Sequence, residues 1–373
     1  MIVGGTPTPV LIFGGGYDTA LDGGYGTAAT GGQANAGNAL YVINAETGAR
    51  ILAIGSCTGL DPAECSAGTD LDLEVPDMVH SIASEPSVFD ADGDGFADRA
   101  YLADTGGNLW RVDFGTTLAV GDPGDTVVGR LASLADPASA SDQRRFFESP
   151  AVASVSDSAY AATPRYDYIA IGSGTRPDPL GSTVQDRFYA IRDYQATSRM
   201  QDSDGNGLAD AYPRPNSNLP LDHTTLIDAT AAVLDGESDA TRNSDGWFIN
   251  LAAGEKVLSS PTIIAGTALF TTYNPDEAAT ANVCAVNIGA GRAYGIDLLD
   301  ASESIDFLNN GPSEADGDMI DERGFIVGGG IPSNVVPIFT KEGVVTIVGT
   351  EGGAQTLDQV VTLPQFRTYW HEE

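Results

Sequence analysis

The sequence is poor in basic residues. Its 373 residues include 18 Lys and Arg against 52 Asp and Glu, which gives a formal net charge of −34 at pH 7. A chain with this charge repels nucleic acid and anionic membrane surfaces, and it attracts divalent cations. We therefore expect no nucleic-acid partner, and acidic loops become the first place to search for a binding site.

Long apolar runs are also missing. No stretch of 18 apolar residues occurs, so the sequence predicts no membrane-spanning helix and no direct membrane insertion. The first residues, Met1-Ile-Val-Gly-Gly-Thr-Pro7, contain neither a basic segment nor an apolar core, and they do not look like a signal peptide. We expect them to be the boundary of a fragment of a longer protein.

Cysteine is scarce, with three residues in the chain. Cys57 and Cys65 are eight residues apart in a Gly-, Ser- and Asp-rich stretch, which favours a small disulfide-closed loop; two free thiols are the alternative. Cys284 stands alone, and no further Cys or His lies at a spacing that suits zinc. A disulfide together with low Lys and high Asp and Gly indicates a location outside the cytosol.

Acidic residues follow a regular spacing in Asp90-Ala-Asp-Gly-Asp-Gly-Phe-Ala-Asp98. Side-chain oxygens occupy positions one, three, five and nine, position seven offers a backbone carbonyl, and two glycines allow a tight turn. This is the ligand order of the first part of an EF-hand loop, and hard oxygen ligands suit Ca²⁺. Position twelve is Tyr101 instead of Glu, and both flanks are strand-like, so we expect a calcium loop between β-strands. The expected ligands are Asp90, Asp92, Asp94, Phe96 and Asp98.

A second loop, Asp202-Ser-Asp-Gly-Asn-Gly-Leu-Ala-Asp210, repeats this order with Asn at position five. Four carboxylates about 5 Å apart make six repelling pairs of roughly 0.8 kcal/mol each in water, on the order of 5 kcal/mol in all, and three carboxylates about half that. A cation relieves this repulsion; a solvated acidic turn without an ion is the alternative. The expected ligands are Asp202, Asp204, Asn206, the Leu208 carbonyl and Asp210.

Strand-like runs bounded by turn residues dominate the chain. A pattern recurs five times: Pro or Ser-Pro with a short Val/Ile strand, a second strand, then a third strand with an aromatic and an aliphatic residue before Asp or Asn. The units span residues 9–48, 85–113, 149–193, 260–297 and 331–349. Each predicts a small antiparallel sheet that is buried by radial stacking, as in a β-propeller of about seven blades stretched by insertions. A two-sheet sandwich array is the alternative.

Long stretches interrupt the repeat at 115–142, 194–245 and 300–324. Residues 115–142 and 228–246 are expected to be solvated insertion loops, with partner binding as the alternative. A third cation site in the last stretch is disfavoured by the irregular spacing of its acidic residues, which are Glu314, Asp316, Asp318 and Asp321.

Signs of catalysis are few. There is no Gly-x-Ser-x-Gly elbow and no His-Glu-x-x-His, and the glycines at 14–16 precede no helix, so they indicate a tight turn instead of a phosphate site. The histidines lack partner motifs and are expected to be ordinary surface or packed residues: His80, His223 and His371. The tryptophans are expected to be core anchors: Trp110, Trp247 and Trp370.

The combination of these motifs resembles one known family. Glu85-Pro-Ser-Val, followed by residues 92–113 with Asp-Thr-Gly-Gly-Asn-Leu-Trp-Arg-Val-Asp, resembles the signature of PilY1-type proteins, which are calcium-binding type IV pilus biogenesis factors and tip-associated adhesins. Residues 246–251, 254–261 and 270–273 look like later blades of that family, as do residues 189–193, 328–332 and 367–371.

The resemblance implies a C-terminal domain: one modified seven-bladed β-propeller over residues 1–373 in which calcium occupancy of an Asp-rich loop regulates pilus extension against retraction and surface attachment. It implies a secreted, non-enzymatic protein at the bacterial cell surface, at the pilus tip or associated with the outer membrane. The implied partners are minor pilins or other pilus-tip proteins, and host or abiotic surfaces. The family's N-terminal part, often similar to a von Willebrand A domain, has no counterpart here.

Two other classes of function stay open. A quinoprotein dehydrogenase with pyrroloquinoline quinone is also a calcium-dependent propeller, but it uses adjacent cysteines and repeated Trp docking motifs. Here Cys57 and Cys65 are not adjacent, and Gly-Asn-Leu-Trp occurs once. An integrin-like propeller that binds an extracellular ligand would repeat its calcium loops in three or four consecutive blades, whereas this chain has two well-separated loops.

Overall fold

The computed structural model describes residues 1–19, 36–58, 65, 70–156, 165–210, 220–234, 244–277, 288–305, 323–341 and 343–361. Regular structure in these ranges consists of β-strands, apart from single turns of helix such as the 3₁₀ helix η2 (Ala140–Asp142). No helix within the same ranges has the length and apolar character needed to cross a membrane.

The strands form five sheets of three to five strands and one small ribbon. The ribbon is β1 (Ile2–Val3) with β2 (Thr6–Pro7). The first sheet has the order β3 (Val10–Gly14), β4 (Ala39–Asn44), β5 (Arg50–Gly55), β6 (Leu73–Glu74). The second sheet has the order β7 (Ser87–Phe89), β8 (Arg99–Ala103), β9 (Asn108–Asp113), β10 (Val127–Ser133).

The remaining sheets keep this meander with additions. The third contains β11 (Ala151–Ser156), β12 (Arg165–Gly172), β13 (Arg187–Asp193), β15 (Gly246–Asn250) and β14 (Ile227–Asp228). The fourth contains β16 (Lys256–Val257), β17 (Thr262–Ile264), β18 (Thr267–Asn274), β19 (Ala290–Asp297) and β20 (Gly324–Gly329). The fifth contains β21 (Val336–Thr340), β22 (Gly343–Thr350) and β23 (Gly353–Val361).

Each sheet packs its faces against its neighbours in sequence. In β8, Ala100 and Leu102 belong to the apolar cluster shared with the first sheet, while Tyr101 and Ala103 belong to the cluster shared with the third. Two further clusters join the third sheet to the fourth and the fourth to the fifth. Because side chains alternate between the faces of a strand, a central strand buried on both faces is apolar at nearly every position.

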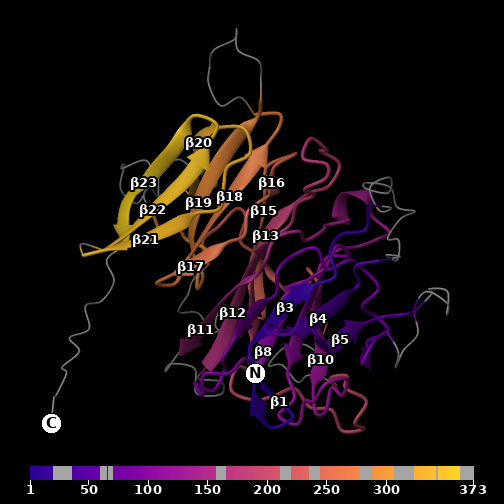
Figure 1. Cartoon of the computed structure of the whole chain (residues 1–373). Helices are drawn as coiled ribbons and strands as arrows, with labels where there is room; N and C mark the ends of the chain where they lie inside the picture. The colour runs from indigo at the N-terminus through magenta and orange to yellow at the C-terminus, as the bar shows by residue number, and fades with distance from the viewer. Residues whose placement is uncertain are drawn as a thin grey trace, which may run out of the picture.

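This arrangement confirms the all-β fold and the stacked-sheet order that the repeat predicted. Each of the five predicted units contributes strands to one sheet, and Figure 1 shows the sheets following one another from the indigo N-terminal strands to the yellow C-terminal ones. The first and last sheets lie apart in this view. The described residues form five blade-like sheets, and the count of seven blades stays a prediction.

One expectation about the insertions is wrong. Residues 115–142 are not simply a solvated loop, because they contain β10, in which Val128 and Leu131 are fully buried. The apolar residues of β10 do not stand out in the sequence because Gly-, Asp- and Pro-rich segments flank them. In 228–246 the described residues include the end of β14 and a buried Ala229.

Other local predictions are confirmed. Cys57 and Cys65 form a disulfide with their Cα atoms 5.3 Å apart. Trp110 and Trp247 are buried, and their indole N–H groups donate to Asp104 Oδ2 at 2.9 Å and to the Leu298 carbonyl at 2.8 Å. The tryptophans therefore anchor the core with their polar edge satisfied.

Candidate functional site

The first aspartate loop (residues 90–98) closes the hairpin between β7 and β8. Phe89 and Arg99 pair at the ends of these strands, and the Asp98 N–H donates to the Phe89 carbonyl at 3.1 Å. The Asp98 carbonyl accepts a hydrogen bond from the Phe114 N–H at 2.8 Å. The loop is therefore held at both ends by one sheet, between strands as the sequence predicted.

Asp90 organises the turn. Its Oδ1 accepts hydrogen bonds from the N–H groups of Gly93 and Asp94 at 2.6 and 3.2 Å, and its Oδ2 accepts from Gly95 at 2.7 Å. Gly93 and Gly95 have φ values of 86° and 90°, a region that disfavours side chains, so the turn requires glycine at both positions. Donation from the Gly95 N–H is the main reason that the pKa of Asp90 is lowered.

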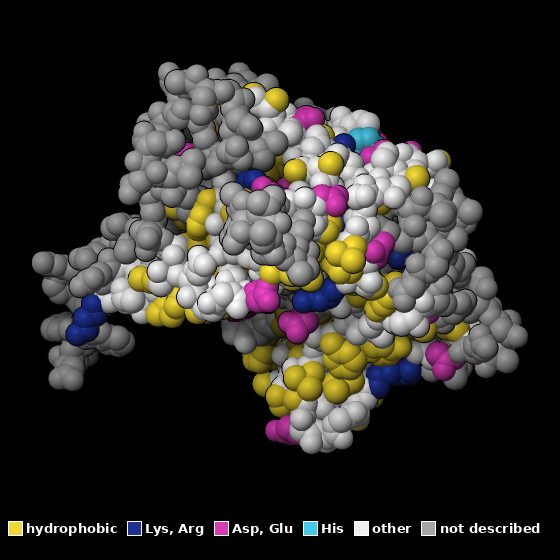
Figure 2. All heavy atoms as spheres, turned by 90° about the horizontal axis from the view of Figure 1, so that it is seen from above, with side chains coloured by type: hydrophobic (Ala, Val, Ile, Leu, Met, Phe, Trp, Pro, Cys, Tyr) yellow, Lys and Arg dark blue, Asp and Glu magenta, His cyan; other side chains and the backbone are white. Residues whose placement is uncertain are grey.

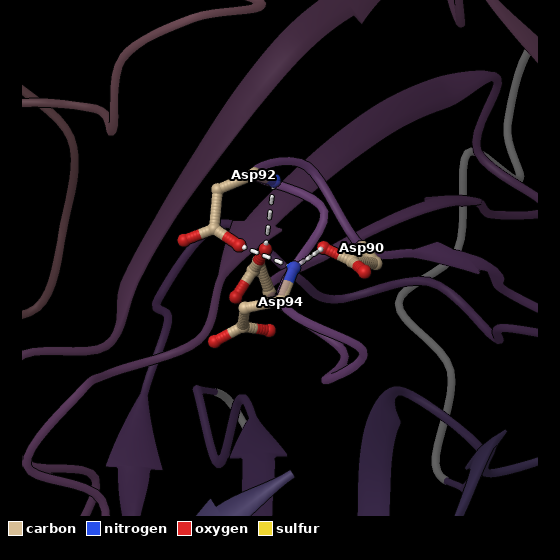
Figure 3. Close-up of side chains that lie close together, drawn as sticks. Asp90, Asp92 and Asp94 are labelled. Atoms are coloured by element: carbon tan, nitrogen blue, oxygen red, sulfur yellow. Dashed lines mark hydrogen bonds between the residues drawn. The ribbon is translucent and has the colours of Figure 1, made fainter. Parts of the chain in front are cut away.

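Four carboxylates meet inside this turn. One oxygen each from Asp90, Asp92, Asp94 and Asp98 lies within 4.8 Å of the others, and Figure 3 shows the first three side chains around one bend of the chain. Within the described ranges, these four residues form a group of potential metal ligands of the size that could hold an ion. Burial, followed by the charges of Asp92 and Asp94, raises the pKa of Asp98. A divalent cation would offset this repulsion, and the all-oxygen donor set fits Ca²⁺.

The second aspartate loop (residues 202–210) has the same internal hydrogen bonds. Asp202 Oδ1 accepts from the Gly205 N–H at 2.8 Å, and Asp202 Oδ2 accepts from the Gly207 N–H at 2.7 Å. In both loops the last aspartate accepts from the N–H at position two at 2.8 Å. Although burial acts in the opposite direction, the N–H groups of Gly207 and Gly205 lower the pKa of Asp202.

The surroundings of the second loop are different. It lies in the long connection between β13 and β14 and packs against β10. The Val128 N–H of β10 donates to the Gly207 carbonyl at 2.9 Å, and the Ala209 N–H donates to the Val128 carbonyl at 2.8 Å. A Cβ atom on Gly207 would lie 2.5 Å from Leu73 Cδ1 of the first sheet. The second loop is therefore anchored by neighbouring sheets instead of by a hairpin.

Position five also differs between the loops. In the second loop the Asn206 amide donates to Asp204 Oδ2 at 3.0 Å, so it occupies a carboxylate oxygen. The carboxylates here are not gathered as closely as those of the first loop, as far as the described residues go. The ligands predicted for the second loop are Asp202, Asp204, Asn206, Leu208 and Asp210. This set stays a prediction, and so does the Phe96 carbonyl as a ligand in the first loop.

A buried chain of hydrogen bonds connects the loops. Arg99, which directly follows Asp98, donates from Nε to Asp113 Oδ1 at 2.7 Å. Asp113 Oδ2 accepts from the Met200 N–H at 2.7 Å, two residues before Asp202. Arg99 and Asp113 are 2% and 1% exposed. The end of one loop and the start of the other are therefore fixed to the same carboxylate.

The same network ties the second sheet to the third. Arg111 donates from Nη1 to Asp193 Oδ2 and from Nη2 to Asp113 Oδ2, both at 2.7 Å. The Tyr101 hydroxyl donates to Asp193 Oδ2 at 2.6 Å, and Arg99 donates to Asp167 Oδ2 at 3.1 Å. Burial raises the pKa of Tyr101 well above its usual range, so this hydroxyl keeps its proton. The sequence signal for this network is the Asp that ends the third strand of the repeat, which is Asp113 in the second sheet and Asp193 in the third.

In the part of the chain that the structure describes, the remaining sequence candidates add no further group of three or more metal-ligating side chains. His80 packs over Gly106, where a Cβ atom would lie 2.0 Å from His80 Cδ2, and this agrees with a packed histidine. Acidic side chains are scattered over the face in Figure 2 and do not form one patch there. Several candidates lie outside the described residues: Cys284, Glu314, Asp316, Asp318, Asp321, Trp370 and His371.

Comparison with known proteins gives two informative matches, although no family model matches the chain. The chain is 24% identical over 315 residues to a type IV pilus biogenesis factor PilY1 homolog from Xylella fastidiosa (strain Temecula1 / ATCC 700964). This match covers 78% of the chain and 17% of the relative, so the chain spans less than a fifth of that protein's length.

A solved structure matches over more of the chain. The crystal structure of the Pseudomonas aeruginosa PilY1 C-terminal domain superimposes with a TM-score of 0.58 at 17% sequence identity, over 92% of this chain and 68% of that one. At this identity the match shows the fold. The resemblance to PilY1-type C-terminal domains, which the sequence motifs indicated, is thus confirmed by a relative in sequence and by a solved structure.

Proposed function

We propose that this chain is a calcium-binding, non-enzymatic domain of a type IV pilus assembly and adhesion factor. The observation that carries the proposal is the convergence of four aspartate oxygens within 4.8 Å on the β7–β8 hairpin of a PilY1-like fold. The pilus role is inferred from the similarity to a PilY1 homolog. The second loop is proposed as a further calcium site because its internal hydrogen bonds are the same.

Calcium acts by linkage in this proposal. An ion that binds the ordered loop better than other loop conformations shifts the population toward the ordered one. The first loop lies at the end of a sheet hairpin, so an ordered loop offers a defined surface to minor pilins or other tip proteins outside the cell. The result is a domain whose contacts with the pilus machinery, and whose effect on extension, retraction and surface attachment, depend on calcium.

Calorimetric titration of calcium into the chain tests the proposal. Asp98→Asn is expected to abolish the heat of the first site, and Asp210→Asn that of the second. Asp222→Asn is a matched control, because Asp222 also accepts a backbone N–H in an exposed turn, from Thr224 at 2.7 Å, but lies outside both loops. Unchanged titrations in both loop variants would refute the calcium assignment.

The pilus role needs a separate test. In the producing cells, the full-length protein with Asp98→Asn is expected to alter surface piliation and twitching while the protein is still exported. Wild-type piliation and twitching in that strain, despite lost calcium binding by the purified chain, would contradict calcium regulation of the pilus.

A further inference from the structure

A cavity of about 390 Å³ lies between the first and second sheets, away from the first aspartate loop. Most of its lining comes from three segments. The segment after β6 provides Asp77 and His80, the turn between β8 and β9 provides Thr105, and β10 with the segment that follows provides Arg130 and Arg145. Its volume is in the range of cavities that hold small ligands.

The cavity is cationic in a strongly acidic chain. Its lining contains three arginines, Arg130, Arg144 and Arg145, and one acidic residue, Asp77, and Arg144 is ion-paired with Asp142 next to the lining, so the formal charge is 3 − 2 = +1 with His80 neutral. The whole chain carries −34. Arginine is suited to planar anions because its guanidinium presents a fixed fork of donors. The charge of the cavity therefore points to an anionic ligand.

Two polar atoms of the lining have no hydrogen-bond partner among the described residues. One is Thr105 Oγ1, whose residue is 5% exposed while its backbone N–H is satisfied by the Ser81 carbonyl at 2.9 Å. The other is Arg130 Nε. Buried polar atoms without partners are uncommon, because each one loses the hydrogen bonds that water would supply. Both atoms belong to residues that line the cavity, and because other protein atoms cover them, each side chain must rotate slightly before a bound acceptor can reach it.

Two of the three arginines are held in place by contacts within the chain. Arg144 donates to the carbonyls of Gln185 and Leu134 at 2.8 and 3.2 Å. The Arg130 guanidinium lies 5.6 Å from the centre of the Trp110 ring. Its ion pair with Asp77, at 3.1 Å, involves a carboxylate that is 69% exposed, and such pairs are weak and readily exchanged. An anion bound in the cavity can therefore replace Asp77 as the partner of Arg130 with little rearrangement.

We propose that this cavity binds a carboxylate of a partner peptide, either an Asp or Glu side chain or a free C-terminus. A formal charge of +1 inside a chain of −34 favours a singly charged group over a phosphate dianion, which the rest of the protein repels more strongly. Apolar walls from Pro76, Val79 and Pro137 suit the carbon skeleton that carries the carboxylate. This site goes beyond the calcium proposal, because it uses none of the predicted ligands of either loop.

Calorimetric titration with three short peptides tests the proposal, in chelator so that the result is independent of calcium. The probes are N-acetyl-Gly-Gly-Gly with a free carboxylate, N-acetyl-Gly-Asp-Gly-amide, and the neutral N-acetyl-Gly-Asn-Gly-amide. We expect at least one acidic peptide to bind with a dissociation constant of about 1 mM or tighter, and the neutral one not to bind. The acidic peptide that binds identifies the source of the carboxylate.

Variants connect binding to the cavity. Arg130→Gln is expected to weaken binding about tenfold because it removes the positive charge and the forked donors, and Thr105→Val a few-fold because it removes the hydroxyl donor. Thr105→Val leaves the urea midpoint unchanged or higher, since it removes an unsatisfied buried hydroxyl. Arg50→Gln is the matched control, because Arg50 also pairs with an aspartate, Asp72 at 3.3 Å, outside the cavity. Equal binding of the neutral peptide, no binding of any peptide, or full affinity in Arg130→Gln would overturn the proposal.

Discussion

In the first aspartate loop the N–H groups of Gly93 and Gly95 donate to Asp90, and in the second those of Gly205 and Gly207 donate to Asp202 at nearly the same distances. The first loop joins two paired strands, whereas the second rests on β10 and reaches Leu73. Nine residues therefore suffice to set the turn, while the neighbouring sheets determine how firmly it is held and how closely its carboxylates gather.

The largest effect is expected where the loops share an anchor. Asp113→Ala would remove one of the two buried carboxylates that each of Arg99 and Arg111 contacts, leaving them Asp167 and Asp193, and breaking such buried pairs costs about 3–5 kcal/mol of unfolding free energy. Removing Asp113 also removes the acceptor of the Met200 N–H, so the second loop should lose more calcium affinity than the first, which keeps its hairpin. Urea denaturation and calcium titration measure the two effects.

The pair between Arg50 and Asp72 is the control for this variant, because Arg50 is its exposed partner. Arg50→Gln is expected to cost about 1 kcal/mol or less, since the Arg50 side chain is 41% exposed. A similar cost for Asp113→Ala, or an equal loss of affinity at both loops, would show that the network does not support the loops.

A pH-dependent effect of comparable size is expected far from both loops, at Asp186. Burial raises the pKa of this fully buried carboxyl from 3.8 to about 6, against the opposing effects of the Ser173 hydrogen bond, Lys256 and Arg144. The proton is therefore held more tightly in the folded chain. The stabilisation from this bound proton is complete below about pH 4 and is lost as pH rises through 6. The free energy of unfolding therefore decreases by about 3 kcal/mol.

Asp186→Asn should lack this decrease, so its unfolding free energy, compared with wild type by urea denaturation from pH 4 to 7, should fall less with pH. A parallel pH profile in the two proteins would contradict the assignment. The result matters for the loops, because calcium titrations at different pH are comparable only when this background is known.

An exchange at position five tests the difference in donor sets. Asn206→Asp gives the second loop four carboxylates, and Asp94→Asn gives the first loop three. Since added carboxylate charge increases calcium affinity, we expect the first change to strengthen and the second to weaken binding, each about tenfold. Calorimetry on each variant measures this, with Asp222→Asn as control. Unchanged affinities would mean that position five does not bind the ion.

Much of the fold was predictable because it depends on local sequence patterns. The Pro-initiated strand repeat identified all five sheets, and the Cys57 and Cys65 spacing identified the disulfide. The prediction failed at β10, whose apolar residues are embedded in turn-forming ones. Sequence spacing likewise specified the turns of both loops, since these are made by hydrogen bonds within nine residues.

What lay beyond prediction depends on residues that are distant in the chain. Arg99 meets Asp167 across 68 positions and the Ser198 carbonyl across 99, and only the packing of two sheets brings them together. The cationic cavity has the same origin, because His80 and Arg145 belong to different elements. A charged residue at a strand end gives no sign in sequence of the partner it will meet.

The smallest expected effect compares one glycine position in the two loops. Gly95 and Gly207 have φ values of 90° and 80°, so alanine at either position carries a backbone cost of about 1 kcal/mol. Nothing lies within 4 Å of a Cβ atom on Gly95, whereas one on Gly207 meets the buried Leu73 side chain at 2.5 Å. Overpacking of this kind adds about 1 kcal/mol or more. Gly207→Ala should therefore destabilise the chain about twice as much as Gly95→Ala, as measured by urea denaturation with chelator present. Equal costs would mean that the second loop does not pack tightly against the first sheet.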